Sequence, residues 1–219
     1  QHLYTGHVVS LLDDVDNRSF EFYEVARSYS GVFGAATILL TYLLARRLWP
    51  EPRGRWVGLI AATFVTFSFN HVKESHYGVT DATLTFFVVL AFIAVASAYR
   101  RGTTGAYALA GFACGIACAT KYSALPIVFV LVAAHFVSGT SVLAAWRRLA
   151  VGLLAVPVGF FAGYPYALLN WPPFLEHLGW MSAYSGSREF DPSERFWYIL
   201  RYTMDSGLGA PLAVGSRQI

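Results

Sequence analysis

The stretch that decides the fold runs from His71 to Phe87 and reads HVKESHYGVTDATLTFF. Its first part is polar and ionisable, whereas apolar segments flank it at Trp56–Phe69 and Ala82–Tyr99. Ionisable groups at a membrane boundary are costly to bury and are therefore candidates for function. The stretch predicts two neighbouring membrane spans joined by a polar segment. The alternative is a solvated loop that ends in a helix N-cap.

The composition of the whole chain agrees with a membrane protein. The 219 residues are 56% hydrophobic and 13% charged, with a mean hydropathy of +0.48. Several segments approach the roughly 20 apolar residues that cross a bilayer, and they lack the alternation of a transmembrane β-barrel. The predicted fold class is all-α, a polytopic transmembrane helical bundle with about six full spans and the start of a further one.

The chain divides into four predicted regions. The first is the end of an extracytoplasmic loop at 1–24, and the second is a transmembrane helical region at 25–169. The third, at 170–206, is an extracytoplasmic loop or an interfacial helix, and the fourth is the start of a truncated span at 207–219. We therefore expect a fragment of a longer, multi-pass integral membrane protein of the plasma or inner membrane.

The arginines predict the orientation of the spans. If the loops alternate between sides, one side holds eight of the 16 basic residues and a single acid, Glu51. Cytoplasmic loops carry an excess of Lys and Arg, so this side is predicted to be cytoplasmic and the polar stretch at 71–81 extracytoplasmic. The eight residues are Arg46, Arg47, Arg53, Arg55, Arg100, Arg101, Arg147 and Arg148.

Small residues predict one close helix contact. Gly111 and Gly115 form a G-x-x-x-G pattern, which lets a second helix approach closely. Cys114 and Cys118 lie four residues apart in the same segment, where a mutual disulfide has poor geometry on a helix. We interpret the two cysteines as small packing residues rather than metal ligands.

Two charged residues are the sharpest candidates for chemistry. Asp81 stands at the start of a span, so it is a helix N-cap, a first-turn acid stabilised by the helix dipole, or an active-site carboxylate. Lys121 lies between the apolar segments Ala106–Thr120 and Ala124–Ser138. A lysine at that depth either extends to the interface or holds an anion such as a phosphate.

Other polar groups give weaker signals. The side chains of His71, Glu74 and His76 suit a divalent metal, but their spacing is no standard motif, so polar surface residues are the favoured interpretation. The segment 180–205 alternates charges with aromatic residues and could lie in the interface, cover a lipid head group or form a solvated loop. Its Arg188 and Arg195 are candidate phosphate or sugar contacts. The chain contains no Walker loop, dinucleotide fingerprint or serine-hydrolase signature, and we expect no nucleic-acid partner.

Two motifs carry a resemblance to a known family. They are S-H-Y-x-x-x-D-A-x-L-T-F-F at Ser75–Phe87 and G-x-A-x-x-T-K-Y-S-A at Gly115–Ala124. In this order the chain resembles the dolichyl-phosphate-mannose protein mannosyltransferase-like family over most of Leu3–Pro211. These are GT-C fold membrane glycosyltransferases, a group that includes bacterial aminoarabinose transferases.

The resemblance implies an enzyme that moves a sugar from a polyprenyl-phosphate carrier to a protein, lipid or glycan on the extracytoplasmic side, with inversion at the anomeric carbon. The family's second acidic motif falls on Asp81, and its lysine motif places Lys121 at the carrier phosphate. Glu74 and His76 are second choices for catalysis, and Tyr77 and Tyr122 are candidate substrate contacts.

Two departures from the family pattern limit these expectations. Many members carry arginine where this chain has His76, and the family's first acidic motif would precede Gln1, so the chain alone is expected to be inactive. The sequence establishes no cofactor, and a divalent metal ion stays open. The rival class is a non-enzymatic polyprenyl-lipid transporter, flippase or scaffold.

Overall fold

The computed structural model describes residues 2–138, 142–186, 196–198 and 200, and these residues form helices joined by short connections. The all-helical fold class is confirmed for this part of the chain. Its elements, in chain order, are α1 (His2–Leu48), α2 (Arg53–Phe67), α3 (Phe69–His76), α4 (Thr80–Arg101), α5 (Thr104–Thr120), the 3-10 turn η1 (Tyr122–Ala124), α6 (Pro126–Val137), α7 (Val142–Gly163), α8 (Tyr166–Leu169) and α9 (Trp171–Gly186).

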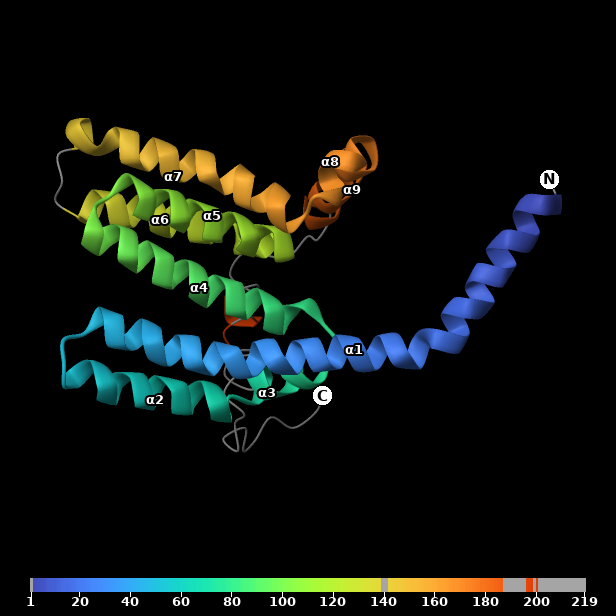
Figure 1. Cartoon of the computed structure of the whole chain (residues 1–219), viewed down its shortest axis with the longest axis horizontal. Coiled ribbons are helices and arrows are strands. Elements are labelled where there is room, and N and C mark those ends of the chain that lie inside the picture. Colours follow the sequence, from blue (N-terminus) through green and yellow to red (C-terminus); the bar gives the residue numbers. More distant parts are fainter. Residues whose placement is uncertain (1, 139–141, 187–195, 199, 201–219) are drawn as a thin grey trace.

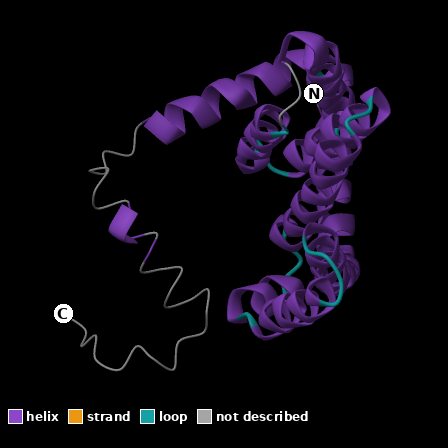
Figure 2. Cartoon of the chain, turned by 90° about the vertical axis from the view of Figure 1, so that its left-hand side faces the viewer, coloured by secondary structure: helices purple, strands orange, loops and turns teal. Residues whose placement is uncertain are grey.

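The long helices lie side by side in a row. Figure 1 shows α2, α1, α4, α5 and α7 following one another across the molecule with their axes nearly parallel. The most extensive contact in the row joins α5 to α7, and α6 packs beside α4, α5 and α7. Seen from one end in Figure 2, the row curves into an arc.

Within the part of the chain that the structure describes, three helices are long and apolar enough to cross a membrane. They cover Phe22–Leu48, Thr80–Arg101 and Ala145–Gly163, with 27, 22 and 19 residues respectively. At about 1.5 Å per residue, 22 residues span roughly 33 Å, which matches the hydrocarbon core of a bilayer. Two shorter apolar helices, Thr104–Thr120 and Tyr122–Val137, lie between them, so the predicted count of six spans remains a prediction.

Large apolar side chains point outward from several helices of the row. Phe64, Phe129 and Leu154 are 72%, 71% and 70% exposed, on α2, α6 and α7 respectively. Water disfavours so much apolar surface, whereas lipid tails accept it. The outward faces of the row therefore fit a hydrocarbon environment.

The interior of the row is built from small residues. Alanines of α4 and α5 pack together in one buried cluster that includes Cys114. Gly111 and Gly115 of α5 lie so close to α7 that a Cβ on either would overlap a backbone oxygen, of Gly152 or Val156 respectively. The predicted close helix contact is thus confirmed, and α7 is the partner.

The two cysteines are packing residues, as expected. Cys114 and Cys118 are buried free thiols on α5, and both belong to buried clusters of apolar residues. Their side chains fill space between helices where a larger residue would separate them.

The arginines gather at one end of the row. The end at the left of Figure 1 contains the C-termini of α1 and α4 and the N-terminus of α7, which carry Arg46-Arg47, Arg100-Arg101 and Arg147-Arg148. The Nη1 atom of Arg100 donates a hydrogen bond to the main-chain oxygen of Arg47 at 2.8 Å. We call this end of the bundle the arginine end and the other the polar end.

Local structure differs from the simplest expectation in two places. Residues of the polar stretch form the short helix α3 rather than a solvated loop, and α1 continues as a helix back to His2. The helix α9 occupies the first part of the segment predicted as a loop or an interfacial helix. The four predicted regions remain predictions, and most of 187–219 lies outside the described residues.

Candidate functional site at the polar end

Helix α3 is fixed against α1 by side chains of α1. The Nε atom of Arg27 donates to the main-chain oxygen of His76 at 2.9 Å, and the hydroxyl of Ser30 donates to the main-chain oxygen of Val79 at 3.1 Å. These carbonyls belong to the last residue of α3 and to the connection that leads into α4. Because both are held, the first turn of α4 begins at a defined position.

A second contact lies one turn further along α1. The imidazole Nε2 of His71 lies 3.1 Å from the main-chain oxygen of Gly34, and the Ser75 side chain fills the space that a Cβ on Gly34 would occupy. The glycine therefore permits the close approach of α3 to α1. His71 serves this packing contact in the structure.

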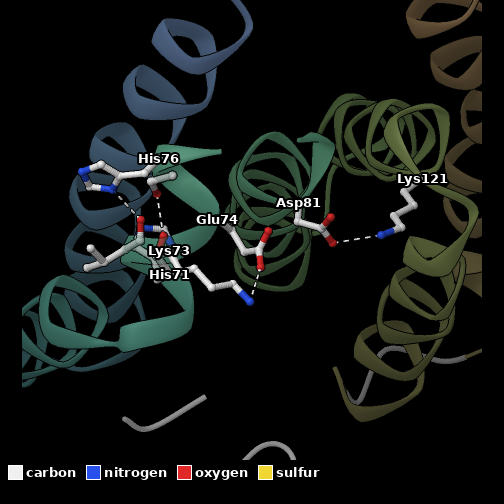
Figure 3. A network of polar contacts seen from close by, with 8 residues as sticks. His71, Lys73, Glu74, His76, Asp81 and Lys121 are labelled. Carbon is white, nitrogen blue, oxygen red and sulfur yellow. Dashed lines mark hydrogen bonds and ion pairs between the residues drawn. The ribbon is translucent and has the colours of Figure 1, made fainter. Parts of the chain in front are cut away.

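The central feature of the polar end is an ion pair between Asp81 and Lys121. The Nζ atom of Lys121 lies 2.9 Å from Oδ1 of Asp81, although the two residues are 40 positions apart. Figure 3 shows the two side chains reaching toward each other from different helices. The sequence-predicted pair of candidates is thus brought together in space.

Asp81 lies in the first turn of α4 and does not cap it. The N-cap position is Val79, and no side-chain hydrogen bond closes this helix end. Of the structural alternatives, the first-turn acid is therefore the correct one. A carboxylate here is stabilised by the positive end of the helix dipole, and it remains available to a partner.

Lys121 is the residue that ends α5. It has an extended backbone, with φ of −160° and ψ of 133°, and the turn η1 follows directly. Its side chain is 46% exposed and that of Asp81 is 44% exposed. A half-exposed ion pair contributes about 1 kcal/mol or less, so a second anion can compete with Asp81 for the lysine.

Glu74 and His76 do not join this pair, and Figure 3 shows His76 on the side of α3 that points away from Asp81. Glu74 pairs with its neighbour Lys73, with Nζ and Oε1 2.9 Å apart. The Nδ1 atom of His76 lies 2.7 Å from the main-chain oxygen of Val72, which only accepts, so Nδ1 carries the hydrogen. The Nε2 atom of the neutral ring is then free to accept a proton.

The residues considered for a metal do not gather around one point. Within the described residues, no group of three His, Cys, Asp or Glu side chains is placed to hold a metal ion. His71 contacts α1, whereas Glu74 turns to Lys73. We therefore derive no step through a metal.

The two candidate tyrosines have different surroundings. Tyr77 follows α3 and is 51% exposed at the polar end. Tyr122 stacks on Phe160 of α7, with ring centroids 6.3 Å apart. Arg188 and Arg195, the other candidate contacts, lie outside the described residues.

Tyr122 also lines an apolar groove of about 330 Å³. The groove lies between the end of α5, the part of α7 around Pro157 and the start of α9. Tyr122 follows Lys121 directly in the chain, so the groove and the charged pair share the residues where α5 ends, although neither Lys121 nor Asp81 lines the groove. The remaining lining residues are Cys118, Leu125, Val156, Pro157, Phe160, Phe161, Phe174 and Leu178.

A polar cleft of about 540 Å³ lies between α1 and α3. The sequence analysis did not predict this cleft. Its α1 wall consists of Glu24, Arg27, Ser28 and Gly31. This spacing of i, i+3, i+4 and i+7 places all four on one helix face. A polar face in the first turns of an apolar span is the signal that could have revealed the cleft. Ser75 and His76 close the opposite wall.

The fold and the site together define a class. The chain forms a row of apolar helices with one arginine-rich end, and its opposite end carries a partly exposed charged pair, an apolar groove and a polar cleft. This is the architecture of an integral membrane protein with a polar site at one end of its helices.

The chain belongs to the dolichyl-phosphate-mannose-protein mannosyltransferase family, whose model matches residues 16–168. The matched segment contains Asp81, Lys121 and the α1 wall of the polar cleft. The resemblance inferred from the two sequence motifs is thereby confirmed.

The chain is also similar to curated bacterial transferases. The undecaprenyl phosphate-alpha-4-amino-4-deoxy-L-arabinose arabinosyl transferase of Pseudomonas paraeruginosa (strain DSM 24068 / PA7) is 35% identical over 148 residues. The protein of the same name from Pseudomonas aeruginosa (strain PAO1) is 34% identical over 148 residues. Each alignment covers 65% of this chain and 26% of the relative, so the chain spans about a quarter of their length. No solved structure matches the chain significantly.

Proposed function

We propose that this chain is part of a membrane glycosyltransferase that takes a sugar from a polyprenyl-phosphate carrier. Family membership supports this function, and so do the relatives, whose names specify an undecaprenyl-phosphate-linked aminoarabinose as donor. The acceptor is a protein, a lipid or a glycan. The rival class, a polyprenyl-lipid transporter or scaffold, is not favoured, because the matching relatives are named as transferases.

The observation that carries the proposal is the contact between Lys121 and Asp81 inside the family-matched segment. Without a donor, the ammonium group of Lys121 is held by a carboxylate. A sugar-linked phosphate carries the same sign of charge and can replace that carboxylate. Lys121 would then bind the carrier phosphate, and Asp81 would be released to act on the acceptor.

The reaction in this proposal balances without an added reagent. A nucleophilic atom of the acceptor attacks the anomeric carbon, and the bond from that carbon to the carrier-phosphate oxygen breaks. The electron pair leaves with the phosphate, where the positive charge of Lys121 stabilises it. The proton of the acceptor passes to a carboxylate acting as a base, a role to which Asp81 contributes. Glu74 and the free Nε2 of His76 are the second choices for proton transfer.

The surroundings of the pair fit a donor with a lipid tail. The apolar groove beside Tyr122 offers a surface for the isoprenoid chain next to Lys121. Tyr77 is exposed on the same end and is a proposed sugar contact. Arg188 and Arg195 stay proposed phosphate or sugar contacts, and no step is assigned to a metal.

We further propose a multi-pass arrangement of six spans. The helices α1, α2, α4, α5, α6 and α7 run between the same two ends of the row, as Figure 1 illustrates. With the arginine end in the cytoplasm, the site lies on the extracytoplasmic side of the plasma or inner membrane. Residues 1–24 and 170–206 are then extracytoplasmic, 25–169 form the membrane region, and 207–219 begin a further span.

Substitution of Lys121 tests the proposal. In the full-length protein, Lys121→Met removes the charge and keeps an unbranched side chain. We expect transfer from a radiolabelled undecaprenyl-phosphate sugar to fall at least 100-fold, because leaving-group stabilisation of this kind contributes about 3 kcal/mol or more. Lys121→Arg retains the charge and should recover part of the activity.

A matched control separates this effect from a general loss of charge. Arg55→Met removes an exposed cation at the arginine end, far from the pair, and should leave transfer unchanged. Membrane insertion of all three variants is measured in parallel. Normal turnover in a well-inserted Lys121→Met protein would refute the assigned role of the lysine.

A further inference from the structure

A second charged cavity lies at the arginine end, away from the site described above. It has a volume of about 340 Å³ and lies between the last turns of α1 and α4. Three arginines, one serine and one alanine line it: Arg47, Arg100, Arg101, Ser97 and Ala96. The lining thus combines positive charge with a hydroxyl group, which is the side-chain chemistry that binds an oxyanion.

The charge in this cavity is not neutralised by the described residues. The acid of this end, Glu51, is engaged by Arg46, whose Nε and Nη2 atoms lie 2.9 and 2.7 Å from Oε1 of Glu51. The guanidinium groups of Arg47 and Arg101 make no ion pair with a described residue. Three like charges around one cavity repel each other unless an anion joins them.

The cavity is also partly organised before any anion binds. Arg100 donates through Nη1 to the main-chain oxygen of Arg47, which ties the end of α4 to the end of α1. A second, adjoining cavity of about 530 Å³ extends from Arg47 and Arg100 toward Trp49 and Tyr99. The charged cavity therefore opens toward aromatic side chains of the kind found at head-group level.

We propose that this cavity binds the phosphate of an anionic phospholipid from the surrounding leaflet. The phosphate diester would lie among Arg47, Arg100 and Arg101, and Ser97 would donate a further hydrogen bond. Trp49 and Tyr99, which are 41% and 47% exposed, would contact the glycerol and upper acyl region. The apolar outer faces of α1 and α4 continue from this point along the direction that lipid tails take.

A lipid is favoured over a soluble phosphate because of this continuity. The cavity lies at the ends of two apolar helices, where an anionic head group is present at high local concentration. A soluble anion would use the arginines alone, whereas a lipid also uses the aromatic and apolar surface. The cavity lies at the opposite end of the bundle from Asp81 and Lys121, so lipid binding there does not depend on the proposed transfer reaction.

The same arginines also fit a simpler role as determinants of orientation, so the test must separate the two. The purified protein is reconstituted from detergent with dioleoyl phosphatidylglycerol or dioleoyl phosphatidylcholine. Retained lipid is counted by native mass spectrometry, and the midpoint of thermal unfolding is followed as each lipid is added. Inorganic phosphate is added in a separate arm to test a soluble anion.

Three variants sharpen the comparison. Arg47→Gln with Arg101→Gln removes two charges from the cavity, and Arg53→Gln with Arg55→Gln removes two charges from the same end without touching it. Ala96→Leu reduces the cavity volume and leaves every charge in place, so the orientation signal is unaltered. Insertion and monodispersity are checked for each protein before lipid is added.

We expect phosphatidylglycerol, but not phosphatidylcholine or inorganic phosphate, to remain bound and to raise the unfolding midpoint of the original protein. The Arg47/Arg101 variant and Ala96→Leu should each bind phosphatidylglycerol about tenfold more weakly, and the Arg53/Arg55 variant should bind it normally. Equal losses in the two double variants would overturn the proposal in favour of diffuse surface charge. Stabilisation by inorganic phosphate to the same degree would overturn the choice of a lipid.

Discussion

At the scale of single residues, one buried polar pair has a structural role that is separate from the charged site. The hydroxyl of Tyr107 on α5 lies 2.9 Å from Nδ1 of His135 on α6, and the two residues are 2% and 1% exposed. The other ring nitrogen of His135 makes no hydrogen bond to a described residue. In an apolar interior, a polar group of this kind depends strongly on its single partner.

We predict that Tyr107→Phe lowers the stability of the protein by about 0.5–2 kcal/mol, because it leaves the imidazole of His135 without a partner. Thermal unfolding in detergent measures the change as a drop of a few degrees in the midpoint. His135→Leu combined with Tyr107→Phe removes both polar groups and should cost less than the two single changes added together. Strict additivity of the two changes would show that the pair is not coupled.

Individual site residues could be predicted from sequence, but their contacts could not. Asp81 and Lys121 stand out because each interrupts an apolar pattern, and the alternation of spans places both at one end. Their direct contact depends on how α4 packs against α5, which hydropathy does not encode. Arg27 went unnoticed because an arginine near the start of a span is ordinarily an interface residue.

At the scale of elements, the contact of α5 with α7 depends on glycine. A Cβ on Gly115 would overlap the main-chain oxygen of Val156 and lie 2.6 Å from the main-chain nitrogen of Phe160. Backbone atoms cannot rotate away as a flexible side chain can. The two helices would therefore have to move apart, and the groove that α7 lines together with Tyr122 would change shape.

We predict that Gly115→Ala destabilises the bundle by about 1–3 kcal/mol, the usual range for overpacking of a close contact. Gly105→Ala is the matched control on the same helix, because nothing lies within 4 Å of a Cβ at that position. The control should be neutral or slightly stabilising, since alanine favours helix. Equal unfolding midpoints for the two variants would contradict the close packing of α5 on α7.

Elements also differ in how well their sequence predicts them. The long apolar helices and the G-x-x-x-G contact follow from patterns that a single segment contains. The short helix α3 does not, because six of its eight residues are polar, and Arg27 and Ser30 of α1 hold its last residue and the connection that follows it. A loop and a short helix with the same composition are distinguished only by such tertiary contacts.

At the scale of the whole molecule, the two ends of the bundle have different chemistry. The arginine pairs of α1, α4 and α7 share one end, while Asp81, Lys121 and α3 share the other, as Figures 1 and 3 show. This distribution is consistent with both proposals, because the proposed lipid-binding cavity and the proposed transfer site lie at opposite ends. The orientation of the protein in its membrane decides which side each end faces, and it therefore bears on both proposals.

We predict that the two ends are accessible from opposite sides of the membrane. Single cysteines replace exposed residues at Thr104, next to the arginine end, and at Val79, next to α3, in a background with Cys114→Ala and Cys118→Ala. The thiol at position 79 should react with an impermeant maleimide on intact cells. The thiol at position 104 should react only after the membrane is permeabilised, because arginine-rich loops remain in the cytoplasm. Labelling of both positions on intact cells would contradict the placement of the two ends on opposite sides of the membrane. Labelling of position 104 alone would contradict the extracytoplasmic site, and the proposed transfer reaction would then face the cytoplasm.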